Sequence, residues 1–174
     1  MQYLVIVALL LGIVSTAHAQ PYGTGNYDAN VPYGSQTSLT IATNGNVTIP
    51  VSPSDSGTLA TGNSLVTVTS TDVVGYKLYI RSNGSTNLAN GGSNIPASGN
   101  GSPAALAVNT WGYNTDGSSN FVGTTLSDVL IRNGVGPFAS GDVTTVKYGV
   151  KIDNAKPAGN YSGTVIYTAV PQTQ

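Results

Sequence analysis

Cysteine and glutamate are absent from this chain of 174 residues, and histidine occurs once, as His18. The lack of cysteine excludes disulfides, lipid-modified cysteine and thiolate chemistry. Any carboxylate chemistry would have to use the seven aspartates, which are scattered along the chain. No motif supports an enzyme, so we assign no catalytic residue, no metal ligand and no cofactor.

Charge is also scarce, since charged residues make up 7% of the chain against about 25% in ordinary globular proteins. The formal net charge is −1 and there is no basic cluster, which argues against binding to nucleic acid or to an anionic membrane surface. Hydrophobic residues still make up 40%, and glycine is abundant, with 22 residues. This composition favours many short strands joined by tight turns over disorder.

The N-terminus carries an apolar run over residues 3–14, followed by a small-residue motif at Ala17 and Ala19. This pattern predicts a signal peptide over residues 1–19, cleaved before Gln20, although no Lys or Arg precedes the run. An uncleaved anchor is the alternative. Cleavage would also remove the only histidine, which excludes Ser-His-Asp, Cys-His and His/Cys zinc sites from the mature chain.

Residues 20–36 contain mainly Gly, Pro, Asn and Tyr, without an apolar period. We interpret them as an N-terminal arm that precedes a folded domain over residues 37–174. The arm is either an unanchored terminus or a segment that docks on a neighbouring subunit through Tyr22, Tyr27 and Tyr33.

Two strands joined by a hairpin turn are predicted near the start of the domain. Apolar and polar residues alternate over residues 39–41 and again over residues 47–51, and Asn44-Gly45 between them is typical of a two-residue hairpin. Pro50 cannot donate to a ladder, so it places the second strand at a sheet edge.

Further strands are predicted over residues 65–69, 74–80 and 109–113, with a long loop over residues 87–103. Leu126, Val129 and Leu130 are spaced i, i+3 and i+4, which predicts a single helical turn over residues 127–132.

The last long stretch, residues 142–170, reads as a hairpin whose loop spans residues 153–160. In its first strand one face is apolar and the other carries Lys147 and Lys151; the apolar face consists of Val146, Tyr148, Val150 and Ile152. The chain thus offers about eight or nine short strands. The predicted fold is all-β: a single Ig-like or fimbrial-like antiparallel β-sandwich preceded by a signal peptide.

Three motifs carry a resemblance: N-T-W-G-Y at residues 109–113, Y-G-V-K-I-D at 148–153, and P-A-G-N-Y-S-G-T-V-I-Y-T at 157–168. They resemble secreted bacterial β-sandwich surface proteins, including fimbrial and cell-wall-associated domains, and above all those of small-genome, candidate-phylum bacteria. The resemblance implies an extracellular, non-enzymatic protein of surface structures or adhesion.

The first functional hypothesis is a secreted, pilin-like subunit that polymerises with itself into a filament or surface layer. Low charge favours the packing of copies, and an edge strand can accept a strand from the next subunit. The polymer-interface candidates are Tyr22, Tyr27 and Tyr33 in the arm, with Leu39 and Ile41 as donor residues. The alternative for Leu39 and Ile41 is an ordinary first strand of the sandwich.

The second hypothesis is a monomeric adhesin or module that binds a host or cell-surface glycan. Its ligand-loop candidates combine aromatic rings with amide and carboxylate groups: Trp111, Tyr113, Asn114, Asp116 and Asn120. The alternative is that Trp111 belongs to the core, as in many sandwiches.

The sequence also offers two further chemistries. The oxygen-rich loops at residues 116–120 and 153–154 are of a kind that can hold Ca²⁺, although such loops are more often turns that satisfy their own backbone. A Lys–Asn isopeptide crosslink would need a buried lysine, but the pattern places both Lys77 and Lys147 on outward faces.

Overall fold

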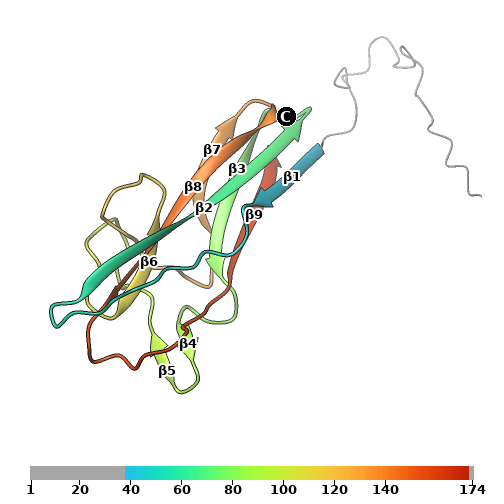
Figure 1. Cartoon of the computed structure of the whole chain (residues 1–174). Helices are drawn as coiled ribbons and strands as arrows, with labels where there is room; N and C mark the ends of the chain where they lie inside the picture. The colour runs from blue at the N-terminus through green and yellow to red at the C-terminus, as the bar shows by residue number, and fades with distance from the viewer. Residues whose placement is uncertain (1–37, 173–174) are drawn as a thin grey trace, which may run out of the picture. The chain divides into compact units, whose positions relative to one another are not determined.

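The computed structural model describes residues 38–172, and this part of the chain contains nine β-strands and no helix. The all-β prediction is therefore confirmed, and no helix in these residues is long and apolar enough to cross a membrane. The strands, shown in Figure 1, are β1 (Ser38–Thr43), β2 (Thr58–Thr71), β3 (Gly75–Ser82), β4 (Leu88–Asn90), β5 (Ser93–Ile95), β6 (Thr110–Asn114), β7 (Val129–Val135), β8 (Phe138–Ile152) and β9 (Val165–Gln172).

The strands form three antiparallel sheets. A four-stranded sheet has the order β1-β2-β8-β6, a three-stranded sheet the order β7-β3-β9, and β4 and β5 form a small hairpin. β2 and β8 are the longest strands, with 14 and 15 residues, and they pair along most of their length. The two larger sheets lie face to face around a shared core, as in a β-sandwich.

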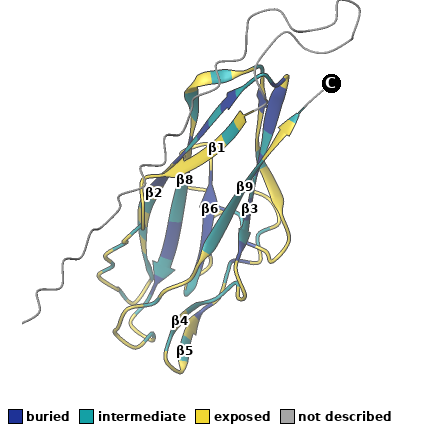
Figure 2. Ribbon diagram, turned by 90° about the vertical axis from the view of Figure 1, so that its right-hand side faces the viewer, coloured by how far each residue is buried: buried dark blue, intermediate teal, exposed yellow. Residues whose placement is uncertain are grey.

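The core has two clusters, which we call the upper and the lower core. Buried side chains from both large sheets form the upper core: Val66, Val68, Tyr76, Leu78, Ile80, Tyr113 and Val146. The lower core lies toward the small hairpin and consists of Ile95, Trp111, Val150 and Ile152. Figure 2 shows the buried residues as dark blue segments within strands of both large sheets.

Alternation in the sequence predicts the strand faces well. In β3, Tyr76, Leu78 and Ile80 are buried while Lys77 and Tyr79 are half-buried on the other face. In β8, the predicted inward residues Val146, Val150 and Ile152 are buried and Tyr148 is half-buried. β6 forms as predicted and buries both Trp111 and Tyr113.

The prediction of a hairpin over residues 142–170 is wrong in its pairing. β8 pairs with β2 and β6, whereas β9 pairs with β3 in the opposite sheet. Residues 153–164 therefore cross from one sheet to the other. Each strand has one apolar face, and the two strands bury these faces against the same core from opposite sides, an arrangement that alternation alone does not distinguish from a hairpin.

The predicted hairpin at Asn44-Gly45 does not form either. β1 pairs with residues 66–71, the C-terminal half of β2, and residues 47–51 lie in no sheet. Gly45 has φ +96°, and after it the chain does not turn back along β1 but continues beside β2, where Val47 and Ile49 lie against Gly62 without ladder bonds.

The predicted helical turn at residues 127–132 is a strand in the structure. β7 pairs with β3 through residues such as Val129 and Leu130. The helical spacing of three apolar residues was misleading, because Leu126 and Leu130 are exposed and form no helical face. Backbone pairing to β3 decides the conformation here.

Candidate functional site

One side of the sandwich is flanked by two edge strands, β1 and β9. They belong to different sheets and approach each other closely, but no hydrogen-bonded ladder joins them. Figure 2 is turned toward this side and shows β1 largely exposed and β9 half-buried. We call it the open side and define it by five core-facing residues of these strands: Leu39, Ile41, Val165, Tyr167 and Ala169.

The open side presents apolar side chains that are only partly covered. Ile41 lies opposite Val68, which is fully buried, so it faces the core, yet its side chain is 40% exposed. On β9, Tyr167 lies opposite Ile80 and Ala169 opposite Leu78, and both β9 residues are half-buried. An edge whose core-facing side chains remain accessible is where a further strand or partner can add.

A pair of tyrosine hydroxyls links the two sheets beside the open side. The hydroxyl oxygens of Tyr148 in β8 and Tyr167 in β9 lie 2.6 Å apart. Burial, and then the neighbouring Tyr167 hydroxyl, raises the pKa of Tyr148, and burial also raises the pKa of Tyr167. Both therefore remain neutral at ordinary pH, and the bond joins β9 to the opposite sheet without a charge.

Below β1 the open side is covered by an irregular extended segment, residues 46–53, which we call the strap. In Figure 1 it is the cyan trace that runs from the end of β1 alongside β2 toward the start of that strand. Val47, Ile49 and Val51 are half-buried and alternate with exposed residues. Ile49 and Val51 pack against the lower core.

The strap is held by side chains and not by a ladder. Within residues 38–172, no backbone–backbone hydrogen bond involves the strap. Val47 and Ile49 lie against Gly62 of β2: a Cβ added there would come within 2.7 Å of Val47 Cγ1 and 3.0 Å of Ile49 Cγ1. Two of the strap's residues, Pro50 and Pro53, lack a backbone donor altogether.

The boundary between β1 and the strap has a defined structure. Asn44 still donates its backbone N–H to the Leu65 carbonyl, at 3.2 Å. Its side-chain Oδ1 accepts the Leu65 N–H at 2.9 Å. The Asn44 side chain therefore makes the last bond to β2 before the chain leaves the ladder at Gly45. Gly45 then takes the positive φ that a residue with a Cβ adopts at a cost.

The far edge of the sandwich, beside β7, is tied more firmly. Arg132 in β7 makes a two-pronged contact with Asp142 in β8, with Nε and Nη2 each 3.1 Å from a carboxylate oxygen. Tyr76 donates its hydroxyl to the same carboxylate at 2.7 Å. This hydrogen-bonded ion pair raises the pKa of Arg132, and it has no charged counterpart among the open-side residues.

The predicted glycan loop is mainly a structural element. Trp111 is 5% exposed and donates its ring N–H to the Thr86 carbonyl at 2.9 Å. Tyr113 is 3% exposed, and its pKa is raised mainly by burial. Stacking of a sugar needs an open aromatic face, so the hypothesis that Trp111 and Tyr113 form such a platform is wrong for this conformation; Trp111 is core.

The other three candidates in that loop do lie together, but they organise the loop itself. The Asn114 amide is buried and donates to the carbonyls of Ser118 and Asn120. Asp116 is exposed and accepts the Ser118 N–H at 3.0 Å, and hydrogen bonds from Ser118 lower the pKa of Asp116. Asn120 is exposed, and its carbonyl receives the Asn114 amide.

Lys147 and Asp153 have similar local roles. Lys147 Nζ donates to the carbonyls of Gly117 at 3.1 Å and Ser118 at 2.8 Å, so it holds the neighbouring loop. The Asp153 carboxylate accepts hydrogen bonds from the Asn109 amide and the Ala155 N–H, in that order the main causes of its lowered pKa. These contacts are those of turns that satisfy their own polar groups.

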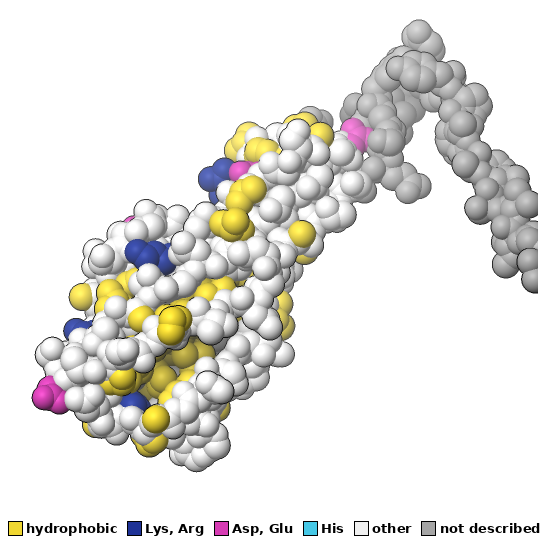
Figure 3. Space-filling view, viewed as in Figure 1, with side chains coloured by type: hydrophobic (Ala, Val, Ile, Leu, Met, Phe, Trp, Pro, Cys, Tyr) yellow, Lys and Arg dark blue, Asp and Glu magenta, His cyan; other side chains and the backbone are white. Residues whose placement is uncertain are grey.

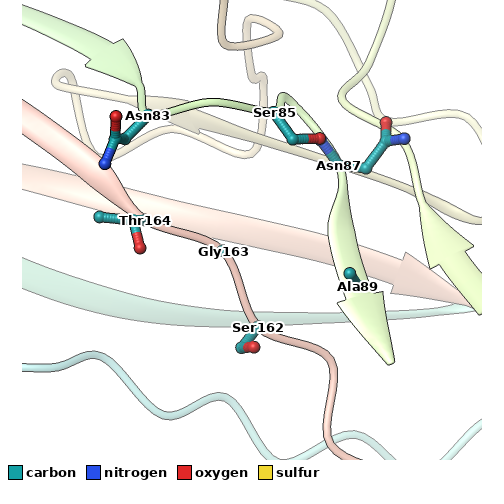
Figure 4. A pocket seen from close by; sticks show the side chains of 7 residues that line it. All are labelled: Asn83, Ser85, Asn87, Ala89, Ser162, Gly163 and Thr164. Atoms are coloured by element: carbon teal, nitrogen blue, oxygen red, sulfur yellow. The ribbon is translucent and has the colours of Figure 1, made fainter. Parts of the chain in front are cut away.

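Sequence reasoning missed two hollows. One is a polar depression of about 260 Å³ between the loop after β3 and the chain that leads into β9. Figure 4 shows its lining residues, which are mostly amides and hydroxyls: Asn83, Ser85, Asn87, Ala89, Ser162, Gly163 and Thr164. The other, of about 380 Å³, lies between Tyr113, Val122 and Val129 and the loop at residues 98–101.

Of the polymer-interface candidates, Leu39 and Ile41 lie on the open side, as an edge-strand interface requires. Tyr22, Tyr27 and Tyr33, like the predicted signal peptide and arm, lie outside the described residues. The strap was predicted as a strand. Pro50 is the one feature of its sequence that indicated an incomplete ladder.

Comparisons with known proteins add no relative. No protein-family model matches the chain, and neither a curated protein nor a solved structure matches it.

Proposed function

We propose that this chain is a secreted, non-enzymatic surface structural protein that associates with itself into a filament or surface layer. In this proposal the fold is an Ig-like or fimbrial-like sandwich and its partner is a second copy of the chain. The observation that carries the proposal is the open side, where core-facing residues of two edge strands remain partly exposed.

The physical argument begins with the unpaired backbone. β1 and β9 each hydrogen-bond to one neighbour, so each leaves one edge free. An added strand would gain main-chain hydrogen bonds from such an edge and would cover apolar side chains such as Ile41. Few charges oppose close packing of copies, as the space-filling view in Figure 3 illustrates for one face.

Secretion is part of the proposal and is supported by the apolar run and the Ala17-x-Ala19 motif. Expression of the full chain in a secreting bacterial host, followed by intact-mass measurement, tests it. Cleavage before Gln20 is expected, and a cell-associated product that keeps residues 1–19 would contradict it.

Self-association is tested by negative-stain electron microscopy and light scattering of residues 20–174 over a concentration series. We expect filaments or sheets from the wild-type chain and at least a tenfold higher critical concentration for Ile41→Lys, because a charge on the open side opposes strand addition. The matched control is Val143→Lys, which replaces a 55% exposed valine on the outer face of β8. Monodisperse wild-type particles at all concentrations would refute the proposal.

A glycan-binding module remains the second candidate, now at the polar depression in Figure 4 instead of at Trp111. Its volume suits one sugar ring, and its side-chain amides and hydroxyls match sugar hydroxyls in kind. A glycan array with wild type, Asn83→Ala and Ser162→Ala tests it: loss of a signal in both variants supports this site, and a signal that neither variant changes rules it out.

A further inference from the structure

The strap has the sequence pattern of a strand but lacks the hydrogen bonds of one. Its apolar residues Val47, Ile49 and Val51 alternate as in a ladder strand. Ile49 and Val51 pack against the lower core, and Val47 lies against Gly62 of β2. We propose that the strap is a displaceable cover and that β1 of a second copy takes its place. This inference deepens the proposed self-association, on which it rests.

The first argument is how the strap is held. Its contacts to the body are made by three half-buried side chains, whereas a ladder strand also contributes a backbone hydrogen bond at every second residue. Releasing it therefore breaks no ladder. A replacing strand that pairs with a free edge gains those bonds in addition to the same apolar contacts.

The second argument is the geometry of its ends. Gly45, at φ +96°, precedes the strap, and Gly57, at φ +82°, follows it. Apart from its two chain neighbours, no residue comes within 4 Å of the position of a Cβ on Gly45, so this hinge has room to rotate. A Cβ on Gly57 would instead meet Val108 Cγ2 at 3.0 Å and Lys151 Cε at 3.2 Å, and the Gly57 N–H donates to the Ser54 carbonyl at 2.9 Å. The strap can therefore swing out at its Gly45 end while the turn at Gly57 holds its other end.

The third argument identifies the occupant. The strap reads N-V-T-I-P-V at residues 46–51, and β1 reads S-L-T-I-A-T at residues 38–43. Leu39 and Ile41 would occupy the places of Val47 and Ile49, and the β1 sequence has no proline, so every residue keeps its donor. β1 is itself an edge strand that pairs only with β2, so its release breaks one ladder, and pairing with the second copy forms a ladder again.

A disulfide staple gives the decisive test, because the chain has no cysteine of its own. The double variant Val47→Cys/Gly62→Cys places two thiols where a Gly62 Cβ would lie 2.7 Å from Val47 Cγ1. Oxidation fixes the strap on β2, and dithiothreitol releases it. The wild-type chain under the same two conditions is the control for the reagent, and circular dichroism of the oxidised variant confirms the fold.

The probe is a labelled synthetic peptide of residues 36–44, with binding measured by fluorescence anisotropy. We expect the reduced variant to bind it at least tenfold more tightly than the oxidised variant. A peptide with Leu39→Asp and Ile41→Asp should bind to neither form. Equal affinity for the oxidised and reduced forms, or no binding to either form or to wild type, would overturn the inference.

Assembly of the same samples separates this inference from the proposed function. If wild type and the oxidised variant assemble equally well, self-association stands and the strap is not displaced. If no sample assembles but the peptide binds only to reduced protein, the strap inference stands and the proposed function fails.

Discussion

β1 and the strap follow one another in the chain with nearly the same pattern, S-L-T-I-A-T and N-V-T-I-P-V, yet they bind the body in different ways. All six residues of β1 pair in register with β2. The strap makes no backbone hydrogen bond within residues 38–172 and is held by apolar side chains over the lower core. One segment is fixed by its backbone and the other by its side chains.

The difference shows what alternation specifies. A period of two places apolar side chains on one face, and both segments turn that face toward the core. It does not choose the partner of the backbone. That choice is made locally, by Gly45, which leaves the ladder, and by Pro50, which could not complete it.

Proline substitutions should give the largest difference in stability between β1 and the strap. In β1, alternate N–H groups point toward β2, so either Thr40→Pro or Ile41→Pro removes a ladder bond. We expect the worse of the two to lower the free energy of unfolding by about 2–3 kcal/mol, from the lost bond and the orphaned acceptor. Thr48→Pro in the strap should cost less than about 1 kcal/mol. Urea denaturation of all three variants measures the effect.

The control for this comparison is position-matched, since Thr40 and Thr48 are both exposed threonines within an x-T-I sequence. If Thr48→Pro destabilises the protein as much as the worse β1 substitution, the strap has a ladder partner in solution and the contrast between the segments is lost.

Truncation of apolar side chains should destabilise the protein more in the strap than in β1, the reverse of the proline substitutions. Ile49 packs against the lower core and lies close to Gly62, whereas Ile41 is 40% exposed. We expect Ile49→Ala to lower the free energy of unfolding by about 1–2 kcal/mol and Ile41→Ala by less than about 1 kcal/mol. The reason is that truncation of the partly exposed Ile41 removes less buried apolar area. Thermal and urea unfolding measure both. Equal losses would mean that the strap contributes no more core contact than the edge strand.

The sequence was sufficient to predict the all-β class, most strand positions and the faces of β3, β6 and β8, because burial imposes a period of two on each. It was insufficient for pairing. β8 and β9 were predicted as a hairpin, but each residue pattern is satisfied equally by two sheets facing one core, and the Tyr148–Tyr167 hydroxyl contact across that core has no local signature.

The candidate sites followed the same division. Leu39 and Ile41 were predicted as donor residues from their alternation near the start of the domain; the structure places them on the edge strand β1, and their part in an interface stays a prediction. Trp111 was predicted as a sugar platform because polar loop residues follow it. It is buried instead in one cluster with Ile95 and Val150, which come from distant parts of the chain, and the strap residue Ile49 packs against this cluster. The lining of the polar depression could not be predicted from the sequence either, because it combines residues 83–89 with residues 162–164.

The smallest effect is expected where the two segments meet. Asn44 Oδ1 accepts the Leu65 N–H and so completes the β1 ladder with a side chain. Asn44→Ala should lower the free energy of unfolding by about 0.5–1 kcal/mol, since the N–H is exposed enough for water to replace part of the bond. Asn44→Asp keeps an acceptor oxygen and should be nearly neutral, and Asn46→Ala, an exposed site two residues on, serves as the matched control. Amide exchange of Leu65, measured by NMR, locates the effect: faster exchange in Asn44→Ala alone supports a side-chain end to the ladder, whereas unchanged exchange would mean that the boundary is set by Gly45 and not by Asn44.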